Sequence, residues 1–121
     1  MARTRPLILL VEDQPLIARH MADLLDQEGF AVLGPAHAVT PALALIAKTP
    51  PDAALLDLDL GGVTSLPVAE ALAGRGVPFA FLSGHGAEAL PAAMRGRPLL
   101  AKPAMPEALL ALLRALLEGR G

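Results

Sequence analysis

The chain has 121 residues, a formal net charge of −2 and a hydrophobic content of 54%, which predicts one domain, over residues 1–121, with a packed core. Its apolar runs are strand-sized and no cysteine is present, so we expect no membrane span, disulfide or thiolate metal site. The scattered charges and the aromatic content of 2% argue against a nucleic-acid partner, and the missing secretory signal makes a cytoplasmic location the default expectation.

Short apolar runs predict five β-strands along the chain. These runs are Leu7–Val11, Ala31–Leu33, Ala53–Leu56, Phe79–Leu82 and Leu99–Ala101. Their length suits buried strands, and each is followed by a segment with helical spacing or by turn residues. Such alternation is typical of a parallel sheet with helices on both faces.

The intervening segments predict helices of unequal strength. The first is the clearest, because Pro15 suits its first turn and Gly29 lies just past its end. Shorter helices are predicted over 40–48 and 65–74, a weak one over Ala87–Met94, and a leucine-rich one from Pro106. The fold class is therefore α/β, a flavodoxin-like, doubly wound (βα)5 sheet in the order 2-1-3-4-5 with a short or weak fourth helix.

Polar side chains follow four of the predicted strands. They are Glu12 and Asp13 after the first, Asp57 and Asp59 at the third, Ser83 after the fourth and Lys102 after the fifth. Carboxyl ends of parallel strands share one edge of the sheet, so we expect these groups to converge. Acids that close together repel by roughly 3 kcal/mol per pair, and a hard cation such as Mg²⁺ offsets this.

These residue types suit phosphoryl transfer. Asp57 can act as a nucleophile that forms an acyl phosphate, while Lys102 and Ser83 can bind phosphoryl oxygens. Taken singly, each residue also fits an ordinary role, such as a loop acid, a helix cap, a turn residue or a solvated lysine. We expect His20 on the buried side of the first helix, and His37 and His85 to be loop residues rather than ligands.

The segment Leu9–Asp13, the strand ending at Asp57, Ser83 and the pair Lys102-Pro103 resemble the receiver domain of bacterial two-component response regulators. The resemblance covers essentially the whole chain. It implies that Asp57 is the phosphoacceptor of a sensor histidine kinase or phosphotransfer protein, and that the Lys102–Pro103 peptide is cis. It also implies a division of roles at the site: Mg²⁺ binding by Asp13, Asp57 and the Asp59 backbone carbonyl, with Glu12 acting through water, and phosphoryl binding by Ser83 and Lys102.

Further segments, among them Leu60–Gly62, Phe81–Gly86 and Arg95–Pro98, resemble the FATGUY receivers. That resemblance implies a stand-alone receiver and a kinase of the HWE or a related type. One position departs from ordinary receivers, which carry Tyr or Phe three residues before the lysine, where this chain has Leu99. The usual aromatic switch is therefore absent, and we hypothesise that the Gly84–Arg97 segment transmits the signal by changing its order.

Two other functions remain open from the sequence. A small Mg²⁺-dependent phosphatase of the HAD type is one, because Asp57-Leu58-Asp59 resembles its nucleophile motif, although that motif normally lies on the first strand. The other is a pseudo-receiver that binds partners without phosphorylation. The receiver interpretation predicts that the protein is not an enzyme and catalyses only its own phosphoryl transfer and slow dephosphorylation. The leucine stripe of the last helix, with Leu110 and Leu117 at its edge, also raises the hypothesis of a homodimer through the fourth helix, fifth strand and fifth helix.

Overall fold

The computed structural model describes residues 5–119; residues 1–4 and 120–121 of the predicted domain lie outside it. Parallel strands form one sheet in the predicted order β2-β1-β3-β4-β5. The strands are β1 (Leu7–Val11), β2 (Ala31–Ala36), β3 (Ala53–Asp57), β4 (Phe79–Ser83) and β5 (Leu99–Ala101). Every residue of β3 and β4 is buried, which explains why these strands are continuous apolar runs rather than alternating ones.

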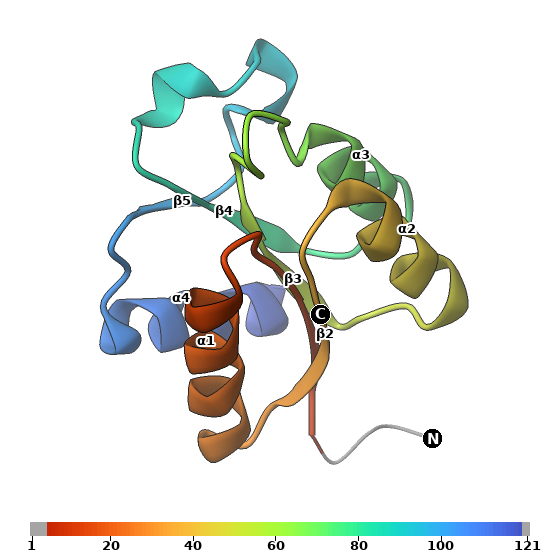
Figure 1. Ribbon diagram of the computed structural model, residues 1–121, viewed down its shortest axis with the longest axis vertical. Coiled ribbons are helices and arrows are strands. Elements are labelled where there is room, and N and C mark those ends of the chain that lie inside the picture. Colours follow the sequence, from red (N-terminus) through yellow and green to blue (C-terminus); the bar gives the residue numbers. More distant parts are fainter. Residues whose placement is uncertain (1–4, 120–121) are drawn as a thin grey trace.

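Helices cover both faces of the sheet. They are α1 (Pro15–Gln27), α2 (Val39–Lys48), α3 (Leu66–Gly74) and α4 (Pro106–Gly119). Figure 1 shows α1 and α4 on one face and α2 and α3 on the other. Successive strand residues point to opposite faces, so Leu55 enters the core under α1 and α4 and Leu56 enters the core under α2 and α3.

The predicted weak helix between β4 and β5 is present as two 3₁₀ helices, Ala87–Ala89 and Ala92–Met94. Pro91 separates them, because proline offers no backbone N–H to continue a helix. Leu90 and Met94 are buried and anchor this segment to the core. The described residues thus form four α-helices, and the connection between β4 and β5 contains two 3₁₀ helices instead of an α-helix, which agrees with the predicted short or weak helix there.

Strand β2 is longer than the predicted run Ala31–Leu33 and contains a β-bulge. Leu9 pairs with Leu33, whereas Val11 pairs with Ala36, so β2 holds one more residue than β1 between these pairs. Gly34 makes the bulge with φ +97°, and a Cβ there would lie 2.6 Å from the amide nitrogen of Ala36. The bulge extends β2 to the same edge of the sheet as the acidic residues.

Two side chains differ from the sequence expectation. His20 is exposed, because Met21 takes the inward position beside it on α1. Leu110 is buried in the core under α4, so it is not at the edge of an exposed stripe, and Leu117 packs partly against the same core.

No helix within residues 5–119 has the length and apolar character required to cross a membrane.

Candidate functional site

The acids of the site meet because β1 and β3 are neighbours in the sheet. Val11 lies opposite Leu56, which brings the next residues, Glu12 and Asp57, to the same level. Carboxylate oxygens of Glu12, Asp13 and Asp57 all lie within 4.8 Å of one another. The predicted convergence of the first and third strand ends is therefore present in the structure.

Lys102 supplies the positive charge among these acids. Its Nζ lies 3.0 Å from Asp57 Oδ2 and 3.4 Å from Glu12 Oε1. The carboxyl side chains of Glu12 and Asp57 are 1% and 5% exposed, while the lysine side chain is 26% exposed. Buried carboxylates are costly without a partner, and one ammonium group that bridges both offsets part of this cost, together with the Gln14 amide at Glu12 and the Asp59 amide at Asp57.

The electrostatics of the site act most strongly on Glu12. Burial raises its pKa from 4.5 to about 7; the amide of Gln14 opposes this rise, the Asp57 carboxyl adds to it, and the charge of Lys102 opposes it. For Lys102, burial lowers the pKa, but the hydrogen bond and charge of Asp57, together with Glu12, outweigh burial and leave the pKa above its usual value. Lys102 therefore stays charged, whereas Glu12 can hold a proton near neutral pH.

Ser83 ends β4 next to this cluster. It is 3% exposed, and its Oγ accepts a hydrogen bond of 3.0 Å from the backbone N–H of His85. This bond uses a lone pair of the hydroxyl and not its proton, so the Ser83 hydroxyl can still donate to an acceptor. A cavity of about 380 Å³ opens at the site and is lined by acidic, basic and neutral polar side chains, among them Asp13, Asp57, Asp59, Ser83, His85 and Lys102. His85, which we expected to be a simple loop residue, thus borders the cavity.

Asp59 has a different position from the other three acids. It is exposed, its Oδ1 accepts a hydrogen bond of 2.9 Å from the Gly62 amide, and its own amide donates to Asp57 Oδ1 at 3.3 Å. Its carboxylate is outside the three-acid cluster of Glu12, Asp13 and Asp57. Asp59 therefore supports the loop and the Asp57 carboxyl, and the implied role of its backbone carbonyl stays a prediction.

The three-acid cluster fits a hard divalent cation. Its oxygen donors come from one edge of the sheet, and Mg²⁺ binds through one or two carboxylates while keeping several waters. Asp13 and Asp57 also line the acidic cavity, whereas the buried Glu12 is not among its lining residues. The residues that are present thus match the chemistry of Mg²⁺.

Two contacts to Glu12 were not predicted from the sequence. The Gln14 amide lies 3.2 Å from Glu12 Oε2, and His37 Nδ1 lies 2.9 Å from the Glu12 carbonyl oxygen. His37 directly follows β2, so the rule that strand ends share one edge would have identified it had the strand been extended to Ala36.

Leu99, at the position where ordinary receivers carry an aromatic residue, starts β5 opposite Phe81. It is half-buried and packs against the core that contains Leu90 and Met94. The Leu99 side chain therefore packs in the same core as the buried residues of the 3₁₀ segment between β4 and β5.

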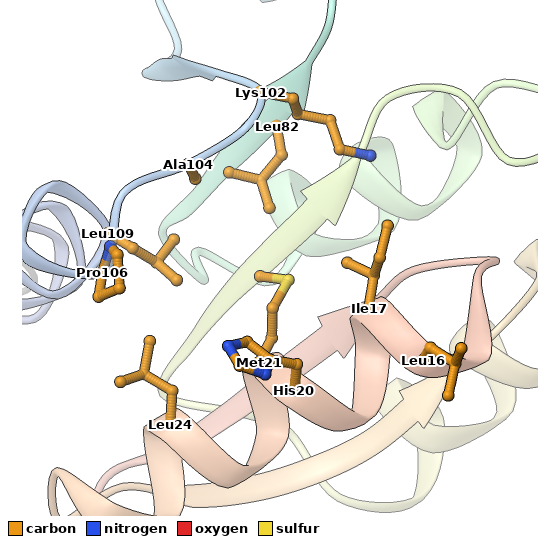
Figure 2. A pocket seen from close by; sticks show the side chains of 10 residues that line it. All are labelled: Leu16, Ile17, His20, Met21, Leu24, Leu82, Lys102, Ala104, Pro106 and Leu109. Carbon is orange, nitrogen blue, oxygen red and sulfur yellow. The ribbon is translucent and has the colours of Figure 1, made fainter.

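An apolar groove adjoins the acidic cavity. It has a volume of about 410 Å³ and lies between α1 and the loop that leads into α4 (Figure 2). Leu16 and Ile17 on its rim are 84% and 37% exposed. Lys102 lines both the groove and the acidic cavity, so the two are contiguous.

Comparison with solved structures gives close matches over nearly the whole chain. SdrG from Sphingomonas melonis Fr1 is 40% identical, with a TM-score of 0.80 over 96% of this chain and 99% of SdrG. The receiver domain of PhyR from Erythrobacter litoralis is 28% identical, with a TM-score of 0.83 over 94% of this chain and 91% of that domain. PhyR from Brucella abortus is 29% identical, with a TM-score of 0.82 over 95% of this chain and 49% of PhyR.

Comparison by sequence leads to the same group of proteins. The positive alginate biosynthesis regulatory protein of Pseudomonas aeruginosa is 39% identical over 89 residues, which is 70% of this chain and 36% of the regulator, so the chain spans about a third of that relative's length. The model of the response regulator receiver domain matches residues 8–114, which include the acidic cluster, Ser83 and Lys102. The chain therefore belongs to the response regulator receiver domain family.

Proposed function

We propose that the chain is a receiver in a bacterial two-component phosphorelay, which accepts a phosphoryl group on Asp57 in a Mg²⁺-dependent reaction. The observation that carries the proposal is the Lys102 ammonium between Asp57 and Glu12, with Asp13 completing a cluster of oxygen donors. A nucleophile, a cation and a hydroxyl donor are thus held around one cavity.

The geometry supports transfer from a phosphohistidine. An Asp57 carboxylate oxygen attacks phosphorus, the new P–O bond forms, and the bond from phosphorus to the donor imidazole nitrogen breaks, leaving the electron pair on that nitrogen. Once Asp57 is phosphorylated, the Lys102 ammonium can bind a phosphoryl oxygen, because it already lies 3.0 Å from the Asp57 carboxyl. The Ser83 hydroxyl can donate to a second phosphoryl oxygen, because the hydrogen bond that it accepts from the His85 amide uses a lone pair and not its proton.

The cation has a separate part in this proposal. Mg²⁺ held by Asp13 and Asp57, with Glu12 through water, would neutralise charge on the phosphoryl oxygens and offset the repulsion among the acids. Glu12 would then lose the proton that its pKa of about 7 allows it to hold in the metal-free protein.

The phosphodonor is a sensor histidine kinase, for which the HWE type is our specific prediction, or a phosphotransfer protein. We infer that it docks in the apolar groove. The rim residues Leu16 and Ile17 are exposed apolar side chains, and the groove shares Lys102 with the acidic cavity. A partner bound there would place its phosphohistidine near Asp57, and the partner would cover the exposed apolar side chains on the rim of the groove.

Other properties belong to the same proposal. We predict a cytoplasmic protein that has no nucleic-acid partner, belongs to the FATGUY subgroup and has no enzyme activity beyond its own phosphorylation and dephosphorylation. The homodimer hypothesis loses part of its basis, because Leu110 is buried and Leu117 is partly packed. The receiver match over 8–114 also disfavours the HAD phosphatase alternative, which requires turnover of small phosphate esters.

Phosphorylation by a small phosphodonor with Mg²⁺, followed by intact-protein mass, tests the proposal. The wild-type protein should gain one phosphoryl group, and Asp57→Asn should gain none. Asp59→Asn is the matched control, because that exposed carboxylate lies outside the three-acid cluster and its substitution should leave labelling in place. Labelling of Asp57→Asn would refute the phosphoacceptor, and a wild-type protein that is never labelled would favour the pseudo-receiver.

A further inference from the structure

The backbone of Glu12 is bound on both sides by two consecutive residues at the end of β2. Its N–H donates a hydrogen bond of 2.9 Å to the Ala36 carbonyl oxygen. Its carbonyl oxygen lies 2.9 Å from Nδ1 of His37. A carbonyl oxygen can only accept, so this contact requires the proton of the His37 ring on Nδ1.

The β-bulge brings His37 to this place. Without the extra residue in β2, Val11 would pair with Pro35 instead of Ala36, and His37 would lie one position further along the edge. Gly34 permits the bulge because it has no Cβ, and a Cβ there would lie 2.6 Å from the amide nitrogen of Ala36 in the same strand. Bulges commonly redirect side chains beside functional sites, and here the redirected residue, His37, reaches the backbone of Glu12.

The bound carbonyl belongs to the peptide that joins Glu12 to Asp13. Its orientation therefore sets the direction in which the Asp13 side chain leaves the backbone. The Glu12 carboxyl has its own contacts with Lys102 and the Gln14 amide. Among the described residues, by contrast, no hydrogen bond or ion pair holds the Asp13 carboxylate, so its place in the cluster depends on the backbone.

We propose that His37 is a positioning residue of the acidic site, which orients Asp13 toward the cation through the Glu12–Asp13 peptide. The inference rests on the proposed function, because it assumes that the three-acid cluster binds Mg²⁺. Groups that hold metal ligands in place commonly contribute to metal affinity as much as some ligands do. His37 touches neither the cation nor the phosphoryl group in this proposal, and it acts only by fixing the peptide.

Substitutions that remove or retain the donor test the inference. His37→Leu removes it, whereas His37→Asn keeps an N–H donor near the position of Nδ1. We expect the Mg²⁺ dissociation constant to rise about threefold to tenfold in His37→Leu and to stay within about twofold of wild type in His37→Asn. Thr40→Leu, which places the same apolar side chain on an exposed position of α2 nearby, should leave it unchanged.

Two further readouts separate positioning from a general structural role. With a small phosphodonor, the labelling rate of His37→Leu should fall at low Mg²⁺ and return to the wild-type rate at saturating Mg²⁺. In the metal-free protein, nitrogen-15 NMR of the imidazole should show the Nδ1–H form. The amides of Glu12 and Gln14, which are both hydrogen-bonded in the structure, should exchange faster in His37→Leu.

The outcomes distinguish this inference from the proposed function. Normal Mg²⁺ binding by wild type with an unchanged dissociation constant in His37→Leu would overturn the inference alone. An equal loss in His37→Asn and His37→Leu would also overturn it, because the donor would then be irrelevant. Failure of the wild-type protein to bind Mg²⁺ would overturn the proposed function and the role of His37 with it.

Discussion

Lys102 lies 3.0 Å from Asp57, although the two residues are 45 positions apart in the chain. The lysine starts from the end of β5 and the aspartate ends β3, so the ion pair spans the intervening strand β4. The same ammonium also reaches Glu12 at 3.4 Å. One side chain thus couples three strand ends, and its loss should affect folding and chemistry together.

Replacing Lys102 with Met should destabilise the metal-free protein at about pH 8 by about 1–3 kcal/mol. The substitution leaves the buried carboxyls of Asp57 and Glu12 without their shared cation, and the 26% exposure of the lysine side chain keeps the loss below that of a fully buried pair. Urea unfolding in the presence of a chelator measures the change. Lys48→Met, at the exposed end of α2, is the control, and equal stability of Lys102→Met and wild type would contradict the account.

The stability of the metal-free protein should fall as the pH rises through neutrality, and Glu12→Gln should remove much of this slope. The folded-state pKa of Glu12, about 7, lies above its ordinary value of 4.5, so the folded state holds the proton more tightly. The resulting stabilisation is fully present below 4.5 and is lost as the pH rises through 7, with an upper bound of about 3 kcal/mol.

Urea unfolding between about pH 5 and pH 8 in a chelator checks the sign. The raised pKa of Lys102 lies outside this range and does not interfere. Parallel slopes for wild type and Glu12→Gln would contradict the prediction. Mg²⁺ binding near neutral pH should also release a proton from wild type but not from Glu12→Gln, which calorimetry in buffers of different ionisation enthalpy detects.

Leu16→Asn should weaken phosphotransfer from a protein donor about tenfold or more, while labelling by a small phosphodonor stays near wild type. Leu16 is 84% exposed on the rim of the groove, so its loss removes contact with a partner without opening the core. Ala44→Asn is the control on α2, across the sheet from the groove (Figure 1). Loss of labelling by both donors would show instead that Leu16 supports the acidic site.

Phosphorylation should change amide hydrogen exchange in the Gly84–Arg97 segment. The segment contains two 3₁₀ helices in place of an α-helix, and its buried residues Leu90 and Met94 pack in the same core as Leu99. Short 3₁₀ pieces have weak hydrogen bonds, so a small change at Ser83 can alter their order. Exchange that is unchanged by phosphorylation or by a phosphoryl mimic would sink this hypothesis of signal transmission.

The sheet was largely predictable, because buried parallel strands leave an unambiguous apolar signature. Leu7–Val11 and Leu99–Ala101 match β1 and β5, and the predicted order of strands is the observed one. The error in β2 has a physical cause. Gly34-Pro35 is typical of a strand end, whereas the structure continues the strand through these residues as a bulge.

The site was predictable where its residues follow apolar runs directly. Glu12, Asp13, Asp57, Ser83 and Lys102 gather around one cavity or cluster as strand order alone implied. The contact between His37 and Glu12 could not be foreseen, because it depends on the bulge at Gly34, where the sequence predicts the end of a strand. The exposure of His20 also escaped prediction, since helical spacing alone does not show that Met21, next to it on α1, takes the inward position.

The most direct test of the account is chemical trapping of the phosphorylated residue. After reaction with a small phosphodonor and Mg²⁺, borohydride reduces an aspartyl phosphate to homoserine, and peptide mass spectrometry locates the change. We predict conversion at Asp57, no conversion when Mg²⁺ is chelated, and none in Asp57→Asn. Conversion at Asp13 or Asp59 instead of Asp57, or labelling that does not require Mg²⁺, would contradict the assignment of Asp57 as the phosphoacceptor.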